Sequence, residues 1–199
     1  MNKDKEFLKK MFEFSLFEKD INRNKLNLIK KIRGKSFLIF GAAGSIGSSY
    51  VKELIKYNPK KLLLVDINEN TLVELVRELR SNLALRVDIE VYCQDILSDE
   101  IERLFKKNID YVSNFTALKH VRSEENLLTI LRMFEVNILG LIKILDFSKK
   151  YRVASFYSVS TDKAADPINI MGATKFLMEK IMFTYSKFFY VTSSRFANV

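Results

Sequence analysis

Short apolar runs alternate with amphipathic stretches along most of the chain, beginning at Ser36. Each run is four or five residues long, as is typical of buried strands. The runs occupy residues 37–40, 61–65, 89–92, 111–114, 154–158 and 190–194. Between them, apolar positions recur at helical spacing near residues 45–57, 69–81, 98–107, 125–150 and 172–187. The pattern therefore predicts about six strands joined by helical crossovers.

Such alternation predicts an α/β fold, with a parallel sheet covered by helices on both faces. A doubly wound sheet of the Rossmann type accommodates six strands and five crossovers. The chain has 199 residues, of which 48% are hydrophobic, and this is enough for one packed core. We divide it into a helical N-terminal extension, residues 1–35, and a Rossmann domain, residues 36–199.

The N-terminal extension carries an apolar stripe on a predicted helix. Its members are Phe7, Leu8, Met11, Phe12, Phe14, Leu16 and Phe17. We expect the stripe to pack on its own domain or on a second subunit. A helix lying in the plane of a membrane is the alternative.

The net charge of +9 comes from 33 basic and 24 acidic residues spread along the chain. This mixing indicates a solvated surface rather than a nucleic-acid site, while a small anionic substrate or a membrane surface stay open as partners. No apolar stretch reaches the roughly 18 residues of a membrane span, and the N-terminus lacks a signal-peptide pattern. We expect a cytoplasmic protein.

Cysteine and histidine are too few for a disulfide framework or a metal site. Cys93 is the single cysteine and follows the apolar run 89–92, so we expect a buried structural thiol rather than a nucleophile. His120 is the single histidine. Together they cannot supply the usual ligand set of a zinc site, so we expect no metal.

Three glycines follow the first predicted strand and open a helix. They are Gly41, Gly44 and Gly47, with Ser45 and Ile46 between the last two. In this position they predict a tight turn, a close backbone approach to a pyrophosphate, and close packing of helix on strand. The helix N-terminus would present its N–H groups to the phosphate charge. The motif therefore predicts a dinucleotide cofactor.

Two carboxylates follow the next strands. Asp66 ends the second predicted strand, where it would bind the adenosine ribose and repel a 2′-phosphate, which favours NAD over NADP. Asp66 could also cap the helix that follows. Asp95 comes after the third predicted strand, where it would meet the adenine edge or act as an ordinary turn residue.

Ser160, Thr161, Asp162 and Lys163 place an acid beside an amine after the fifth predicted strand. Lys175 then stands where a Rossmann-fold reductase keeps the lysine of its Tyr-x-x-x-Lys pair, but Met171 holds the tyrosine position. Because a thioether cannot exchange protons, an active site here would use Thr161, Asp162 and Lys163. The alternative is a surface turn that caps the next helix.

These motifs resemble those of the extended short-chain dehydrogenase/reductases. More narrowly, the chain resembles the polysaccharide-biosynthesis nucleotide-sugar 4,6-dehydratases that act on UDP-N-acetylglucosamine or its GDP counterpart, in the branch with methionine in place of tyrosine. The resemblance covers residues 36–199. It is carried by residues 41–47, 117–121, 136–140, 160–164, 169–175 and 195–199.

The resemblance implies a division of roles around bound NAD. Thr161 would serve the sugar 4-hydroxyl, Asp162 would be the acid for the departing 6-hydroxyl, and Lys163 would remove the C5 proton. Lys175 would bind the nicotinamide ribose and favour loss of the 4-hydroxyl proton, while Met171 only shapes the pocket. Burial is expected to raise the pKa of Asp162 and to lower that of Lys163.

Other expected contacts rest on the same resemblance. Lys119 and His120 would line the site after the fourth strand, and Asn198 would contact substrate, although His120 is equally well explained as a helix-start residue bonded to backbone. Asn137 would order the active-site lysine or a water from within the long fourth helix.

The chain also departs from the family pattern. Arg122 replaces a proline, Ala197 replaces a glycine, and family members continue well beyond Val199, so we expect the C-terminal substrate domain to be absent and this part to be inactive alone. Alternative functions are a nucleotide-sugar 4-epimerase or ketoreductase, which usually need the missing tyrosine, and a non-catalytic NAD-binding module. We expect a homodimer formed through the helices at 125–150 and 172–187.

Overall fold

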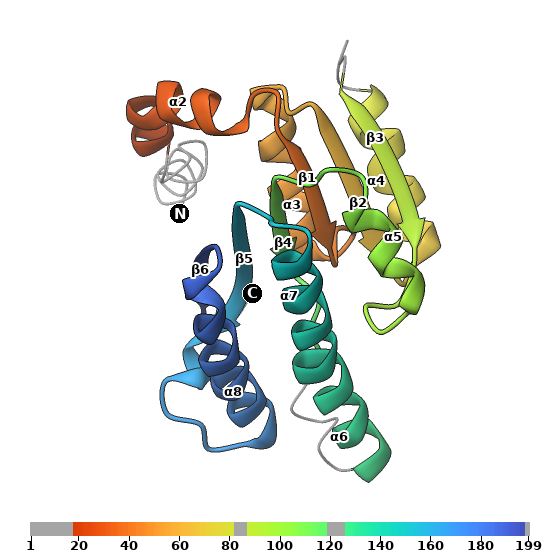
Figure 1. The fold of residues 1–199 in the computed structure, drawn as a ribbon, viewed down its shortest axis with the longest axis vertical. Helices are drawn as coiled ribbons and strands as arrows, with labels where there is room; N and C mark the ends of the chain where they lie inside the picture. The colour runs from red at the N-terminus through yellow and green to blue at the C-terminus, as the bar shows by residue number, and fades with distance from the viewer. Residues whose placement is uncertain (1–17, 82–86, 119–125, 198–199) are drawn as a thin grey trace, which may run out of the picture.

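A six-stranded parallel sheet forms the centre of the computed structural model, which describes residues 18–81, 87–118 and 126–197. The strand order is β3-β2-β1-β4-β5-β6, and every neighbouring pair is parallel (Figure 1). The strands are β1 (Ser36–Phe40), β2 (Lys61–Asp66), β3 (Asp88–Cys93), β4 (Tyr111–Asn114), β5 (Ser155–Thr161) and β6 (Tyr190–Phe196). The chain winds outward from β1 to β3 and then returns to the other side of β1. The predicted doubly wound α/β fold is confirmed.

Helices cover both faces of this sheet. They are α3 (Ser45–Leu54), α4 (Glu69–Ser81), α5 (Glu102–Phe105), α6 (Leu127–Phe134), α7 (Leu141–Lys150) and α8 (Ile170–Thr184), whereas α2 (Glu18–Ile32) precedes β1 and has no buried residue. Side chains of α3 and α4 pack into one hydrophobic core, and those of α5, α7 and α8 pack into the other. No helix in the described part of the chain is long and apolar enough to cross a membrane.

Strand β1 shows why the apolar runs predicted the sheet. All five of its residues are buried, and the four apolar ones alternate between the two cores. Leu38 and Phe40 pack on the side of α7, whereas Phe37 and Ile39 pack on the side of α3. A strand buried on both faces has no polar side to show, so it reads as an uninterrupted apolar run.

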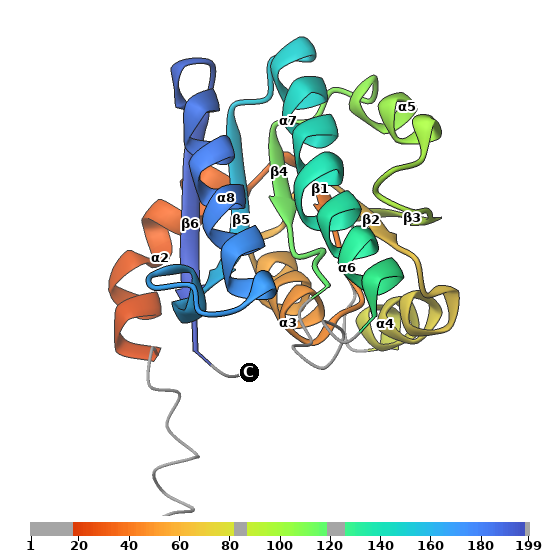
Figure 2. The ribbon, with the colours of Figure 1, turned by 90° about the horizontal axis from the view of Figure 1, so that it is seen from below.

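The helix predicted at 125–150 is continuous but not uniform (Figures 1 and 2). A π-helical segment, η4 (Glu135–Gly140), separates α6 from α7. Such segments contain one extra residue per turn and occur often at functional sites. Here the segment turns Asn137 into the interior, where its side chain is buried.

The prediction for Cys93 was wrong. The thiol is exposed, and its Sγ lies 3.5 Å from the carbonyl oxygen of Ile67. Cys93 ends β3, which is the edge strand of the sheet. Val91 on the same strand is also exposed, because the covering helices bury this edge less completely than the central strands. The N-terminal apolar stripe at 7–17 lies outside the described residues.

Candidate active site

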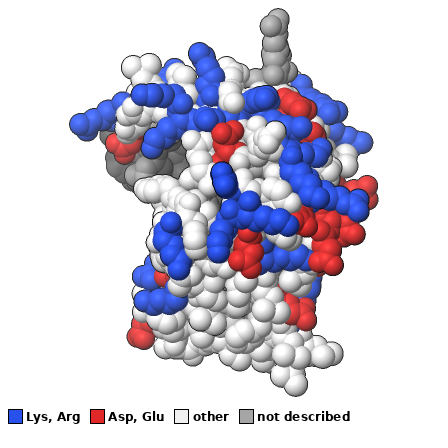
Figure 3. Space-filling view, in the orientation of Figure 1, with Lys and Arg blue, Asp and Glu red and all other residues white. Residues whose placement is uncertain are grey.

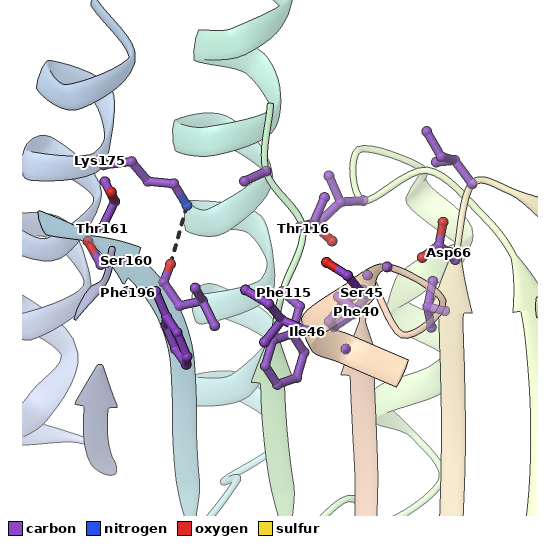
Figure 4. A pocket seen from close by; sticks show the side chains of 18 of the residues that line it. Phe40, Ser45, Ile46, Asp66, Phe115, Thr116, Ser160, Thr161, Lys175 and Phe196 are labelled. Carbon is purple, nitrogen blue, oxygen red and sulfur yellow. Dashed lines mark hydrogen bonds between the residues drawn. The ribbon is translucent and has the colours of Figure 1, made fainter. Parts of the chain in front are cut away.

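A cavity of about 560 Å³ opens at the carboxyl ends of the strands, between the neighbouring strands β1 and β4, whose following helices pack on opposite faces of the sheet (Figure 4). Parallel α/β sheets bind ligands at such switch points. Ser45 and Asp66 lie on one side of the cavity, and Ser160, Thr161 and Lys175 lie on the other. The geometry therefore brings the glycine-rich motif and the proposed catalytic segment together in one site.

The glycine-rich loop has the shape expected of an anion cradle. Gly41 has a φ of 68°, and a Cβ there would lie 2.7 Å from the Phe115 backbone. A Cβ on Gly47 would lie 2.1 Å from the carbonyl oxygen of Gly41, so only glycine fits. At Gly44 the nearest atom would be 3.5 Å away, which leaves room for a ligand. No side chain in the described residues caps α3, so its first N–H groups suit an anion.

Asp66 lines the cavity at the end of β2. Its Oδ2 accepts a hydrogen bond from the backbone N–H of Ala43 at 3.0 Å, and its Oδ1 accepts one from that of Asn68 at 3.1 Å. Asn68 in turn accepts a hydrogen bond from Thr71 N–H in the first turn of α4. Asn68 therefore takes the capping position that the sequence also offered to Asp66, and Asp66 ties the glycine loop to β2.

Asp95 is engaged in a turn and an ion pair. Its Oδ1 accepts a hydrogen bond from Leu97 N–H at 2.9 Å, and its Oδ2 pairs with Arg132 of α6. Asp95 does not line the cavity, whereas its neighbours Gln94 and Ile96 do. The predicted contact with adenine stays a prediction, and Ile96 was missed because one apolar residue in a loop carries no distinctive signal.

Thr161, Asp162 and Lys163 form a compact turn at the end of β5. The Thr161 hydroxyl and the Lys163 backbone N–H each donate to Asp162 Oδ1 at 2.8 Å, and Lys163 Nζ lies 3.6 Å from the same atom. The Asp162 side chain is 56% exposed. The hydrogen bond from Thr161 lowers the pKa of Asp162. The expected rise through burial was wrong for this part of the chain, because the described residues leave the carboxyl group in solvent.

Helix α8 brings Met171 and Lys175 to the cavity wall. The side chain of Asn169 caps the helix by accepting a hydrogen bond from Gly172 N–H at 2.7 Å. Both Met171 and Lys175 are buried, and the four-residue spacing puts them on one face of the helix. Lys175 Nζ donates to the Val159 carbonyl at 3.2 Å (Figure 4). The ammonium group is thus held at the carboxyl end of β5.

Two further contacts fix α8 against the sheet. Asn137 accepts a hydrogen bond from Leu118 N–H and donates to the Leu118 carbonyl, both at 3.0 Å, and it donates to the Thr174 hydroxyl at 3.2 Å. Asn137 thus holds Leu118, which follows β4, and Thr174, which is next to Lys175. Arg195 of β6 donates to both oxygens of Glu179, at 2.8 and 2.6 Å, and lowers the pKa of that carboxyl.

Three predicted contact residues, Lys119, His120 and Asn198, lie outside the described residues. Sequence reasoning did not single out Phe115, Thr116 and Phe196, which line the cavity. They follow or end predicted strands, so the topology could have identified them. Among the described residues, no cluster of three or more His, Cys, Asp or Glu side chains could hold a metal ion.

A family model covers the residues of this cavity. The family model described as "Polysaccharide biosynthesis protein" matches residues 37–199, which include both the cofactor loop and the proposed catalytic segment. The chain belongs to this family. It is thereby a member of the extended short-chain dehydrogenase/reductases, in the group that contains nucleotide-sugar dehydratases.

Curated relatives align with about three quarters of the chain. "Uncharacterized membrane protein MJ1061" of Methanocaldococcus jannaschii is 36% identical over 75% of this chain and 43% of its own length. "UDP-N-acetylglucosamine 4,6-dehydratase (inverting)" of Campylobacter jejuni is 30% identical over 74% of this chain and 42% of its own length. The chain therefore spans less than half the length of these relatives.

Solved structures show the same fold. Pen from Bacillus thuringiensis is 27% identical with a TM-score of 0.73, and the match covers 84% of this chain and 52% of that one. A UDP-glucose 4-epimerase from Thermotoga maritima is 26% identical with a TM-score of 0.67, covering 80% and 54%. Proteins similar to this chain thus include both dehydratases and epimerases, and the residues of the site must distinguish them.

Proposed function

We propose that this chain is the cofactor-binding part of an NAD-dependent nucleotide-sugar 4,6-dehydratase, acting on UDP- or GDP-N-acetylglucosamine. The observation that carries the proposal is the joint placement of Thr161, Lys163, Met171 and Lys175 on the cavity that the glycine loop also lines. A buried methionine at the tyrosine position leaves the proton transfers to the turn after β5. The 30% identity to the Campylobacter dehydratase supports the same reaction.

The cofactor would lie across the carboxyl ends of β1 and β4. Gly44, Ser45 and Ile46 would meet its pyrophosphate, and Asp66 would accept hydrogen bonds from the adenosine ribose. The Asp66 carboxylate would repel a 2′-phosphate, so we favour NAD over NADP. Lys175 would meet the nicotinamide ribose. When bound, the nicotinamide accepts a hydride from the sugar and later returns it.

Thr161 and Lys175 would act at the sugar 4-hydroxyl. The Thr161 hydroxyl lines the cavity, so it can relay the proton that leaves when C4 is oxidised. The Lys175 ammonium group is held by the Val159 carbonyl, and its positive charge would stabilise the negative charge that develops on the sugar 4-oxygen as the proton leaves. The ketone formed at C4 makes the proton on C5 acidic.

Asp162 and Lys163 would then carry out the loss of water. Lys163 takes the C5 proton, and Asp162 protonates the 6-hydroxyl as it departs. For this step the Lys163 amine must be neutral and Asp162 must hold a proton, although the hydrogen bond from Thr161 lowers the pKa of Asp162 in the described structure. The proposal therefore requires that the bound sugar and further polypeptide bury this carboxyl and raise its pKa.

A 4-epimerase is the second candidate, because curated relatives named UDP-glucose 4-epimerase from Rickettsia bellii are also 30% identical over 74% of this chain. Met171 argues against an epimerase, because epimerases of this kind usually need a tyrosine hydroxyl at that position and methionine has none. Incubating the longest product of the gene with NAD and either UDP- or GDP-N-acetylglucosamine distinguishes the dehydratase from the epimerase. A 4-keto-6-deoxy product supports the dehydratase, whereas the C4 epimer with C6 intact would replace it by the epimerase.

A further inference from the structure

The end of the sheet at which the strands begin lies opposite the cavity and carries a concentration of basic side chains. Each of these basic residues lies near the end of a helix or in the connection that enters the next strand. In a parallel sheet all these connections lie at the same end, where the strands begin. The positions are Lys31, Arg33, Lys60, Lys149, Arg152 and Lys187, all exposed. Figure 3 shows Lys and Arg crowding the upper part of the molecule, where β1 to β3 begin in Figure 1. We call this surface the basic edge.

The carboxylates near the basic edge are already matched by other lysines. Asp110 pairs with Lys35 at 3.0 Å, Glu102 pairs with Lys150 at 2.5 Å, and Glu90 pairs with Lys61 and Lys107. Within the described residues, the six side chains of the basic edge form no ion pair of their own. Cations stabilise helix C-termini, but Arg33, Lys60 and Arg152 lie beyond the helices that precede them. Their charge is therefore left over for a partner.

Exposed apolar side chains accompany these charges. Tyr190 begins β6 and is 70% exposed, Phe188 just before it is 47% exposed, and Leu26 on α2 is 82% exposed. Lysine and arginine mixed with exposed aromatic residues are typical of surfaces that meet the membrane–water interface. Polar side chains alone would fit a soluble acidic partner equally well, so these rings favour a lipid surface.

The packing of Phe188 argues against nucleic acid as the partner. The ammonium group of Lys149 lies 4.1 Å from the centre of the Phe188 ring, and that of Lys187 lies 5.2 Å from it. The centre of the Tyr185 ring lies 6.2 Å from the centre of the Phe188 ring. A base that stacked on Phe188 would have to displace these groups, whereas a headgroup phosphate can bind the two lysines where they are.

We propose that the basic edge docks the protein on an anionic lipid surface. Lys60, Arg152, Lys187 and their neighbours would contact headgroup phosphates, and Phe188 and Tyr190 would enter the interface. Because the cavity opens at the opposite ends of the strands, the opening of the cavity would face the aqueous side when the protein is docked. This inference is independent of the reaction that the cavity supports.

Vesicle binding by the full chain tests the proposal. Flotation with phosphatidylcholine vesicles, with and without phosphatidylglycerol, should show binding only to the anionic vesicles, and salt should weaken it. The variant Lys60→Glu/Lys187→Glu removes two headgroup contacts. At about 1 kcal/mol for each basic residue near such a surface, binding should fall at least ~30-fold.

The matched comparison uses two single substitutions that give the same net charge, Lys187→Glu on the basic edge and Arg77→Glu at an exposed position of α4. The Arg77→Glu variant should bind almost as well as the unchanged protein, whereas the Lys187→Glu variant should bind more weakly. Equal loss in both variants would reduce the effect to net charge and overturn the docking edge. Undiminished binding by the Lys60→Glu/Lys187→Glu variant, no binding at all, or tighter binding to single-stranded RNA than to anionic vesicles would overturn it too.

Discussion

At the scale of a single residue, we propose that Asp66 sets the preference for NAD over NADP. Its carboxylate bridges Ala43 and Asn68 and faces the cavity. Replacing Asp66 with Ala removes a charged hydrogen-bond acceptor for the ribose, so the Kd for NAD should rise about 10- to 100-fold. Binding of NADP should change less, because the repulsion of its phosphate is removed as well. Titration calorimetry with both cofactors measures this.

Asn68→Ala is the control for Asp66. It removes a helix cap on α4 but leaves the carboxylate, so stability should fall by about 1 kcal/mol while the preference for NAD remains. Equal losses of NAD and NADP in the Asp66→Ala variant, or tighter binding of NADP by the unchanged protein, would remove Asp66 from its assigned role.

At the scale of elements, the turn from β1 into α3 separates two uses of glycine. Gly47 serves the fold, because a Cβ would overlap the Gly41 carbonyl at 2.1 Å, and Gly47→Ala should cost about 1–3 kcal/mol of stability. Gly44 has a φ of −67°, which any residue can adopt, and has space around it. Gly44→Ala should therefore keep its thermal midpoint but lose cofactor affinity. A strongly destabilised Gly44→Ala, or unchanged NAD binding, would contradict this division.

Strands β2 and β3 and the segment after α5 are joined through Glu90. Burial alone would raise the pKa of Glu90, but hydrogen bonds from Lys107, Lys61 and Tyr92 outweigh it and lower the pKa to about 2 from an ordinary 4.5. Because the folded-state pKa is the lower one, this contribution to stability is complete above pH 4.5 and is lost as the pH falls toward 2. Unfolding by urea across this range should show the loss.

Glu90→Gln provides the comparison for that pH effect. It removes the titrating group, so the free energy of unfolding should be lower near neutral pH and should fall less steeply on acidification. The same slope in both proteins would mean that other carboxylates cause the acid sensitivity.

The strands and helices could largely be predicted from sequence, because β1 and β2 are buried on both faces and the helices between them have one apolar face. Cys93 was predicted wrongly because an apolar run does not reveal that its strand lies at the edge. The direction of the Asp162 pKa shift was predicted wrongly because it depends on how deeply the turn is buried. The resemblance implied a role for the residue but said nothing of which residues cover it. The π segment at Asn137 leaves no periodic signal in so short a stretch.

At the scale of the whole molecule, α6, η4 and α8 expose many large apolar side chains. They are Leu127, Leu128, Leu131, Phe134, Leu139, Phe176, Leu177 and Phe183. The lower part of Figure 3, where α6 and α8 lie in Figure 1, is largely uncharged. Monomers rarely expose so many adjoining apolar side chains. We therefore expect a homodimer through these helices.

Light scattering tests the dimer. Leu128→Glu places a charge in the proposed interface and should give a monomer, whereas Val73→Glu on α4 changes an exposed apolar residue elsewhere and should leave a dimer. A monomeric unchanged protein, or dimers in both variants, would refute the α6–α8 interface.

The central claim is that the turn after β5, and not Met171, moves the protons of a dehydration. The most direct measurement is incorporation of solvent deuterium at C5 of the sugar by the longest gene product in the presence of NAD. We predict exchange in the unchanged protein, none in Lys163→Ala, and largely retained exchange in Met171→Ala. Equal damage by the two substitutions, or undiminished exchange in Lys163→Ala, would contradict the account.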